Sequence, residues 1–337
     1  MERVKEEIIR FLSRGGKDFW SIVSFSNYSA KEVIDAIGTL IKDGIIEERN
    51  EKFYVKNPLP EIVSTSYRCS ECKGRGVVDE KDRWRELLNE YNNIAKERPR
   101  PTTLYDQGVV DSDTALARML YMLERGDIYK KKILILGDDD LMGILFALSK
   151  LPEEIVVLEV DERLVNFIDR VSKKKGLSNL KAIRYDARWE IPEELKGKFD
   201  VFFTDPVETV KGIELFISRL LEGVKGVGSS GYFGLTTIES DMKKWLAIEK
   251  SLLEMNLVIT DVVRKFSWYS LGEGDILESD LPIIKENPFK LGNPKTLWYN
   301  SHLFRVELIG EKVIKIKGEV DWGRDLYFDK YTYVVNP

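Results

Sequence analysis

The sequence predicts an α/β protein in which a Rossmann-like parallel sheet, with helices on both faces, follows an N-terminal winged-helix domain. From residue 132 to about 309, short runs of β-branched and aromatic residues alternate with segments of helical periodicity. Continuous apolar runs of this kind are typical of parallel strands that are buried on both sides. Residues 1–58 show three helical segments before a hairpin, which is the order of a winged helix.

The N-terminal module, residues 1–58, is predicted from apolar spacing. Ile8 and Leu12 lie on one helical face, Val33 and Ile37 lie on another, and a turn at Asn50 joins two short strands. Residues 1–60 hold as many Lys and Arg residues as Asp and Glu residues, so a nucleic-acid-binding surface is disfavoured. We expect a role in dimerisation, or as a lid over the substrate, rather than in DNA binding.

Residues 59–100 combine a cysteine pair with a linker helix. Cys69 and Cys72 form half of a zinc ribbon, and the chain has no second pair of cysteines. Three interpretations stay open: a metal shared by two chains, a disulfide, or two small side chains in a tight turn. A helix is predicted for residues 80–96, and Pro99 marks its end because proline cannot continue a helix.

Composition and charge narrow the class of protein. The 337 residues are 43% hydrophobic, and no apolar run approaches the roughly 20 residues of a membrane span, so we expect a cytoplasmic globular protein. A net charge of −5 favours cationic partners over nucleic acid. The single histidine, His302, excludes a His-rich metal site, and we expect no metal requirement. The 32% charged residues, with one glutamine and two cysteines, are typical of a thermophile.

The catalytic domain is predicted at residues 101–310. Its strands are expected at 133–136, 155–158, 180–183, 201–204, 231–235 and 303–308. Ligands of such sheets bind at the carboxyl ends of the strands. The residues that follow each strand are therefore the first candidates for a functional site.

The first predicted strand ends in Gly137, which is followed by Asp138, Asp139 and Asp140. A dinucleotide-binding loop would place several glycines here, so that the backbone could approach a phosphate. Three acids would repel a phosphate and instead suit a cation, such as a sulfonium or an ammonium group. We expect one of the three to cap the helix that follows.

The next strand ends also carry carboxylates. Glu159 follows Asp138 by 21 residues, close to the spacing at which an acid accepts hydrogen bonds from ribose hydroxyls. Asp186 ends the third strand, where an acid can receive the adenine amino group, and Asp205 ends the fourth. This series of carboxylates predicts a site for an adenosyl-sulfonium.

At these residues the chain resembles the aminopropyltransferases. Segments 132–137, 158–165 and 200–205, together with Asp186, are similar in order and spacing to the spermidine synthase core, and Tyr105-Asp106-Gln107 stands where that family places a cofactor-contacting glutamine. Spermidine synthases have a glycine-rich first loop with one acid, whereas this loop reads Gly-Asp-Asp-Asp. The loop, the winged helix and the acidic, aromatic tail at 311–337 resemble the bis(aminopropyl)spermidine synthases, the branched-chain polyamine synthases.

The resemblance implies a transferase that uses decarboxylated S-adenosylmethionine as its co-substrate. It would add aminopropyl groups to the secondary amine of spermidine, twice, to give a branched quaternary polyamine, and would release methylthioadenosine each time. The residues expected to bind the co-substrate are Gln107, Gly137, Asp138, Glu159, Asp161, Asp186 and Ala187. A homodimer is expected by analogy.

The chemistry needs an uncharged amine in line with the carbon beside the sulfonium. A carboxylate must take the proton of the amine, and repulsion among clustered acids raises the pKa of such a base toward neutrality. We expect Asp139 or Asp140 beside the attacking nitrogen. Asp205 is expected to share that role or to bind one end of the polyamine.

The walls of the acceptor pocket are expected to be acidic and aromatic, because such side chains hold alkylammonium groups by charge and by cation–π attraction. The candidates for substrate binding are Tyr105, Asp205, Glu208, Trp268, Tyr269 and Trp298. The tail fits either a lid that closes over the substrate or an ordinary strand.

Two alternative functions stay open from the sequence. A methyltransferase would use intact S-adenosylmethionine on the same methyltransferase-type sheet, but nucleic-acid amino-methyltransferases place an aromatic ring after the Asp-Pro of the fourth strand. Here Pro206 is followed by Val207 and Glu208, which favours an amine substrate. A winged-helix regulator that senses a metabolite is the second alternative, and the low basicity of the module disfavours it.

Overall fold

The computed structural model describes residues 2–66, 69, 71–77, 81–102, 105, 107–269, 282–289, 291–292, 294–323 and 326–332. Asp106 and the last five residues of the predicted tail lie outside these described residues.

Three helices and a hairpin form the N-terminal part of the chain. They are α1 (Glu2–Leu12), α2 (Phe19–Phe25), α3 (Ala30–Lys42), β1 (Ile46–Arg49) and β2 (Lys52–Val55). Ser29 and Glu32 cap α3 reciprocally, which satisfies two backbone N–H groups at its first turn. Asn50 and Glu51 both have positive φ, as a two-residue turn between antiparallel strands requires. The predicted order of elements is present.

The segment that links this module to the sheet is mostly irregular. It contains α4 (Glu61–Ser64) and α5 (Arg85–Ala95), and α6 (Ser112–Glu124) follows them. The predicted linker helix begins at Arg85 instead of residue 80, because the residues just before it form turns. Cys69 and Cys72 are both free thiols.

A seven-stranded sheet forms the centre of the larger domain, with the strand order β5-β4-β3-β6-β7-β9-β8. Its strands are β3 (Lys132–Leu136), β4 (Glu154–Glu159), β5 (Leu180–Arg184), β6 (Val201–Thr204), β7 (Ser230–Thr236), β8 (Leu257–Trp268) and β9 (Asn300–Leu308). The prediction of an all-parallel sheet is wrong at β9, which runs antiparallel to both β7 and β8. An antiparallel strand can return directly beside its predecessor and needs no crossover helix.

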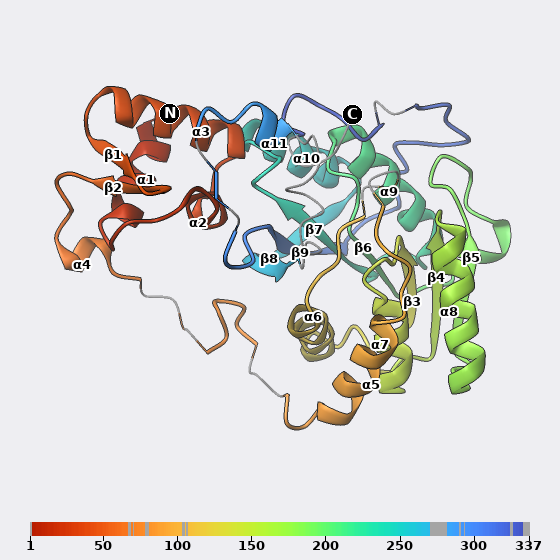
Figure 1. Cartoon of the computed structure of the whole chain (residues 1–337). Coiled ribbons are helices and arrows are strands. Elements are labelled where there is room, and N and C mark those ends of the chain that lie inside the picture. Colours follow the sequence, from red (N-terminus) through yellow and green to blue (C-terminus); the bar gives the residue numbers. More distant parts are fainter. Residues whose placement is uncertain are drawn as a thin grey trace.

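Helices cover both faces of the sheet, as the alternation of buried residues along β3 shows (Figure 1). Ile133 and Ile135 pack into one apolar cluster with residues of α6, α7 (Met142–Ser149) and α8 (Glu162–Lys175). Leu134 and Leu136 pack on the other face with α9 (Val210–Gly223) and α10 (Met242–Glu254). Because successive side chains of a strand point to opposite faces, a continuous apolar run fills both cores.

The N-terminal module packs against the larger domain near β7, β8 and β9 (Figure 1). Its apolar core includes Ile238, Ile283 and Trp298 from the distant part of the chain. The indole of Trp20 lies 4.5 Å, centroid to centroid, from that of Trp298. The backbone N–H of Ala30 donates to the carbonyl of Ile238 at 2.8 Å. The module therefore shares its core with the catalytic domain.

The described part of the C-terminal tail contains no strand and crosses the face of the sheet that α9 covers. The buried guanidinium of Arg219, on α9, ties the tail to the loop after β5. It donates to the carbonyls of Ala187 at 2.9 Å, Ile316 at 3.1 Å and Gly318 at 2.6 Å. This arrangement brings the later tail residues toward the carboxyl ends of the strands.

Among the helices that the structure describes, none is both long enough and apolar enough to cross a bilayer.

Candidate active site

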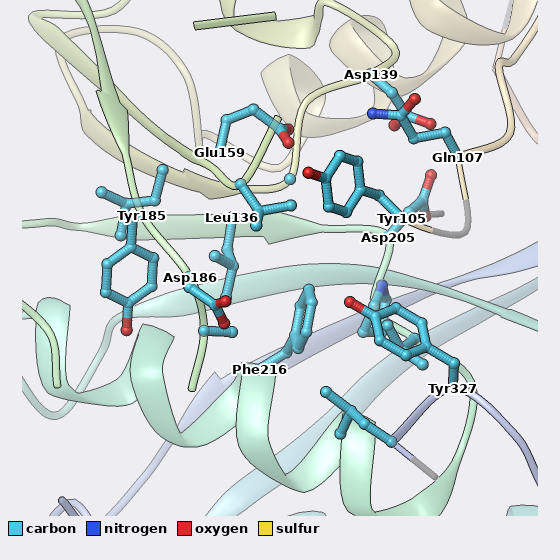
Figure 2. A pocket seen from close by; sticks show the side chains of 17 residues that line it. Tyr105, Gln107, Leu136, Asp139, Glu159, Tyr185, Asp186, Asp205, Phe216 and Tyr327 are labelled. Carbon is cyan, nitrogen blue, oxygen red and sulfur yellow. The ribbon is translucent and has the colours of Figure 1, made fainter. Parts of the chain in front are cut away.

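A pocket opens at the carboxyl ends of β3, β4, β5 and β6 (Figure 2). It brings together eight of the residues predicted for the site: Tyr105, Gln107, Gly137, Asp139, Glu159, Asp186, Ala187 and Asp205. Gly137, which ends β3, has a φ of 74°, so the chain turns through the left-handed region that favours glycine. This turn presents the three consecutive aspartates, and each points to a different partner.

Asp138 turns away from the pocket and toward the start of α7. Its Oδ2 accepts a hydrogen bond from the backbone N–H of Gly143 at 3.0 Å, while its own backbone N–H donates to Glu159 at 2.8 Å. The side chain is buried, and burial raises its pKa well above the usual range. Asp138 is therefore the aspartate that satisfies the helix terminus. It was predicted to bind the co-substrate, but it does not line the pocket and contacts Glu159, which does.

Asp139 is the aspartate that lines the pocket. Its Oδ2 accepts from the backbone N–H of Gly108 at 2.9 Å. Burial raises the pKa of this carboxyl well above its ordinary value, and the carboxylates of Asp140, Glu159 and Asp205 raise it further. Such a group keeps its proton to a higher pH than an exposed aspartate does.

Asp140 is buried behind the pocket wall, with both carboxylate oxygens occupied. The backbone N–H of Val110 donates to Oδ1 at 2.7 Å, and the guanidinium of Arg118 donates to Oδ2 at 2.7 Å. Burial raises its pKa, and Arg118 limits that rise to about 6. Asp140 was predicted as a candidate base, but its carboxylate faces the protein interior.

Asp205, at the end of β6, presents one oxygen to the protein and leaves the other unpartnered. Its Oδ2 accepts from Arg118 at 2.7 Å and from the hydroxyl of Tyr269 at 3.2 Å. Its Oδ1 has no hydrogen-bond partner among the described residues. A Cβ at Gly234 of β7 would overlap this oxygen, so the strand gives it room by carrying a glycine. Asp205 lines the pocket, while its unpartnered Oδ1 is buried against β7.

Arg118, which sequence reasoning missed, organises these carboxylates. It lies on α6 among Ala115, Leu116 and Met119, and its side chain is fully buried. A cation on the apolar face of an amphipathic helix is the one signal in the sequence that could have identified it. Its carboxylate partners come from β3 and β6, which no local pattern connects to α6.

The adenosine side of the predicted site lies at the ends of β4 and β5. Glu159 accepts from the backbone N–H of Asp138 and of Asp161, each at 2.8 Å, and burial raises its pKa. Asp161 caps α8 and also accepts from Gln107 at 3.1 Å, so it positions Gln107 from outside the pocket. Burial opposes ionisation of Asp161, but hydrogen bonds from Arg163 and Gln107 lower its pKa.

Asp186 lies beside the apolar floor of this side of the pocket (Figure 2). Its Oδ1 accepts from the backbone N–H of Arg188 at 2.9 Å, and its Oδ2 accepts from the Arg188 guanidinium at 2.6 Å. Burial favours the protonated form, yet these hydrogen bonds lower the pKa of Asp186. Asp186 stays ionised at neutral pH and can accept a hydrogen bond from a ligand.

Aromatic side chains complete the pocket, and two of them were not assigned to it from the sequence. Phe216 comes from α9, and Tyr327 comes from the tail together with Leu326; Tyr105 was predicted. Figure 2 shows Phe216 between Asp186 and Tyr327 in the lower part of the view. Tail residues are thus part of the pocket wall, whereas the sequence left the tail open between a lid and a strand.

The remaining predicted substrate residues lie outside this pocket. Glu208 bonds to the backbone N–H of Thr236 at 2.8 Å, and burial followed by repulsion from Glu239 raises its pKa to about 7. Tyr269 is buried behind Asp205, which it contacts through its hydroxyl. Trp268 lines a separate cavity of about 740 Å³ between the N-terminal module and β8.

Trp298 was predicted to form part of the acceptor wall, but it lies in the core of the N-terminal module. Its side chain is only 3% exposed and packs against Trp20 in the core of the N-terminal module. The sequence around it is aromatic, and that pattern does not distinguish a binding surface from an interdomain core.

No group of three or more His, Cys, Asp or Glu side chains within the described residues is arranged to hold a metal ion. The carboxylates that line the pocket are bound by backbone N–H groups, by Arg188 and by Arg118. Such a set can attract and orient a polycation, and it can move one proton through Asp139.

Comparisons with known proteins agree with this geometry. Residues 86–333 match the family described as the branched-chain polyamine synthase A C-terminal domain. The chain is 37% identical over 319 residues to an N(4)-bis(aminopropyl)spermidine synthase of Methanocaldococcus jannaschii, which covers 93% of this chain and 89% of the relative. It is 35% identical over 338 residues to the enzyme of the same name from Thermococcus kodakarensis, with coverage of 98% and 94%.

A solved structure shows the same fold. The branched-chain polyamine synthase of Thermus thermophilus, crystallised with N4-aminopropylspermidine and 5′-methylthioadenosine, superposes with a TM-score of 0.86 at 32% identity. The match covers 98% of this chain and 93% of the other. Sequence, strand-end carboxylates and fold thus agree, and the chain belongs to the family of branched-chain polyamine synthases.

Proposed function

We propose that this chain transfers aminopropyl groups from decarboxylated S-adenosylmethionine to the secondary amine of spermidine. Two additions give a branched quaternary polyamine, and each releases methylthioadenosine. One observation carries the proposal: a single pocket joins the carboxylates at the ends of β4 and β5 to Asp139 and Asp205 at the ends of β3 and β6. The ligands of the related Thermus thermophilus structure, an aminopropylated spermidine and methylthioadenosine, support it.

The adenosine part of the donor is assigned to the β4 and β5 side. Glu159 would accept hydrogen bonds from the ribose hydroxyls, and Asp186 would accept one from the adenine amino group. Gln107, held by Asp161, would contact the donor from the opposite wall. When bound, the donor supplies an electrophilic methylene beside a positively charged sulfur.

The acceptor amine is assigned to the β3 and β6 side. Asp139 would take the proton of the attacking nitrogen, because it alone of the three consecutive aspartates lines the pocket. Asp205, which lines the same pocket, would hold a neighbouring ammonium group of the polyamine. A base whose pKa is raised toward the working pH transfers protons efficiently in both directions.

The activity is tested by mass spectrometry of the products. The wild-type protein is incubated with spermidine and either decarboxylated or intact S-adenosylmethionine. We expect one and then two aminopropyl units on spermidine, only with the decarboxylated donor. Methyl additions with the intact donor would instead identify a methyltransferase, and an unchanged polyamine in both reactions would contradict the proposal.

We also propose that residues 1–58 form a winged helix that acts in dimerisation or as a lid, and that the enzyme is a homodimer. The balanced charge of this module and its shared core with the catalytic domain support a structural role over nucleic-acid binding. Light scattering of the full chain should give twice the mass of 39.0 kDa. A monomer mass across the micromolar range would contradict the dimer.

Operation at high temperature is a further proposal, supported by the charged fraction of 32% and the scarcity of amide and thiol side chains that degrade on heating. A melting temperature above roughly 90 °C would place the protein in the hyperstable class. A melting temperature in the range of ordinary mesophilic domains would count against it.

A further inference from the structure

A fully buried cation, Arg118, lies inside a site that has to attract a polycation. Burying a charge is costly unless it is paired, and a positive charge at this place opposes the binding of ammonium groups. The guanidinium is nevertheless inaccessible and sits against the carboxylates of Asp140 and Asp205. We therefore expect a function of Arg118 that compensates for its repulsion of the ammonium groups.

The contacts of Arg118 fix its guanidinium in one orientation. One terminal nitrogen donates to Asp140 and the other to Asp205, each at 2.7 Å. Its Nε donates to the hydroxyl of Ser267 at 3.0 Å. The guanidinium carbon also lies 5.3 Å from the centre of the Phe203 ring. A planar fork held on three sides fixes the directions of two carboxylates at the same time, whereas a lysine ammonium acts as a point charge without a fixed plane.

Arg118 therefore divides the acidic groups into two kinds. Asp140 has both oxygens occupied and does not line the pocket, whereas Asp205 lines the pocket and has one oxygen bound by Arg118. Asp139 has no cationic side chain against its carboxylate among the described residues. Arg98, the nearby arginine, donates to the main-chain carbonyl of Asp139 rather than to its carboxylate.

We propose that Arg118 is the positioning residue that leaves the proton transfer to Asp139: its two ion pairs hold the carboxylates of Asp140 and Asp205 in place, so that Asp139, which lines the pocket, exchanges a proton with the acceptor nitrogen. The inference rests on the proposed aminopropyl transfer and deepens it. Asp205 then holds an ammonium group of the polyamine at the pocket wall. Asp140 serves as the counter-ion that allows Arg118 to be buried.

The proton balance of each addition is simple under this assignment. The ammonium form of the acceptor gives one proton to Asp139, the nitrogen lone pair forms the new C–N bond, and the C–S bond breaks with its electron pair left on sulfur. Asp139 then passes the proton to solvent. The second addition repeats these events on the tertiary nitrogen, so one base serves both steps and releases one proton in each.

The groups that can influence this titration come from several elements. Asp140 and Asp205 face Arg118 from β3 and β6, and the hydroxyl of Tyr269 lies 3.4 Å from it, just past β8. Glu159 on β4 adds a further negative charge near Asp139. The charge of Arg98 also lowers the pKa of Asp140, but only Arg118 forms ion pairs with both Asp140 and Asp205 within the described residues.

The test compares Arg118→Met and Arg118→Lys with the wild-type enzyme. Without the guanidinium, Asp140 should retain its proton to higher pH, and the carboxylates of Asp140 and Asp205 should lose their fixed orientation. For Arg118→Met we expect kcat at neutral pH to fall by at least about tenfold, and the acid limb of the kcat–pH profile to move upward by roughly one pH unit. The kcat and the pH profile of Arg118→Lys should lie between those of the wild type and Arg118→Met, since an ammonium keeps the charge but lacks the planar fork.

Binding of methylthioadenosine separates this role from a purely structural one. The adenosine side of the pocket does not touch Arg118, so the Kd for methylthioadenosine should change by less than about threefold, within the scatter of a site left intact. A normal kcat, or a reduced kcat with an unmoved pH profile, would overturn the proposal. So would a parallel loss of methylthioadenosine binding.

A second comparison covers the case in which Arg118→Met does not fold. Asp139→Asn and Asp140→Asn keep Arg118 and differ only in which aspartate is removed. We expect Asp139→Asn to lower kcat at least about tenfold more than Asp140→Asn, within the range of general-base effects. The reverse order would make Asp140 the base and overturn the inference. Product analysis of the wild-type enzyme decides the proposed function independently of either outcome.

Discussion

The raised pKa of Asp139 links the chemistry of the site to its stability. Below the ordinary pKa of 3.8 the carboxyl is protonated in both the folded and the unfolded chain, so its burial has no pH-dependent cost. As pH rises through the window above 3.8, the unfolded chain ionises first and stability is lost until the folded pKa is passed. The functional form of this residue is thus the less stable one.

Asp139→Asn should therefore melt above the wild type, with a difference that appears near pH 4 and grows as pH rises. It should also lower kcat by about 10²–10⁴-fold, because a general base is removed. Melting curves from pH 3 to 9 and initial rates at neutral pH check both effects. An unchanged melting difference across this range would show that the carboxyl does not titrate as described.

Asp200→Asn is the matched control for that measurement, with the opposite sign. Burial disfavours the charge of Asp200, but hydrogen bonds from Lys225 at 2.6 Å and from the backbone N–H of Lys132 at 2.9 Å lower its pKa. Its ionised form stabilises the fold above the unfolded pKa, and this stabilisation is lost as pH falls through the folded pKa. The variant should melt below the wild type at pH 7 and match it at low pH.

Glu159→Gln should weaken the adenosine side alone. An amide has one acceptor oxygen, so it cannot serve the backbone N–H groups of both Asp138 and Asp161 and also accept from ribose. We expect the Kd for methylthioadenosine to rise by about 10- to 100-fold, the range for hydrogen bonds to charged groups. Calorimetric titration measures this Kd. Asp139→Asn is the control, because it also replaces a carboxyl by an amide in the same pocket.

At the level of elements, the tail forms part of the pocket wall, and Arg219 binds the tail through two of its carbonyls. Deleting residues 320–337 removes Leu326 and Tyr327 from the pocket wall, so we expect kcat/KM for the polyamine to fall by at least about tenfold, the value of one well-made contact. Steady-state rates check this. Lys312→Met is the control, since this lysine bonds to the Val224 carbonyl at 2.9 Å, away from the pocket. Equal rates in the truncated and full-length enzymes would remove the tail from the site.

The strands and their ends were predictable because each depends on local sequence. The runs around Ile133, Val156 and Val201 are apolar on both faces, so they indicate buried strands without any knowledge of their neighbours. The carboxylates that follow them needed only the rule that ligands bind at strand ends. Asp139, Glu159, Asp186 and Asp205 were found in this way, and all four line the pocket.

Other features were not predictable because they depend on contacts between distant segments. The insertion of β9 between β7 and β8 is decided by pairing, not by the composition of the strand. Trp298 and Glu208 carry side chains suited to binding ammonium groups, yet one lies in an interdomain core and the other bonds to Thr236. The role of Arg118 emerges only when α6 meets two strands.

For the whole molecule, the shared core predicts that the N-terminal module and the catalytic domain unfold together. Trp298→Ala should open a cavity in this core and cost about 3–5 kcal/mol of stability. Because Ile238, Ile283 and Trp298 belong to the core of the module, we expect one cooperative transition in calorimetry for the wild type. Two separate transitions would show that the module is an independent unit.

The loop after β3 repeats one amino acid three times, yet the repeat holds no spare copy. Their order in the chain places Asp138 at a helix terminus, Asp139 in the pocket wall and Asp140 against Arg118. Deleting one of the three would shift the residues that follow by one position. The two remaining aspartates could then not occupy all three sites. A library that randomises these three positions should therefore recover active variants with a different set of accepted residues at each position.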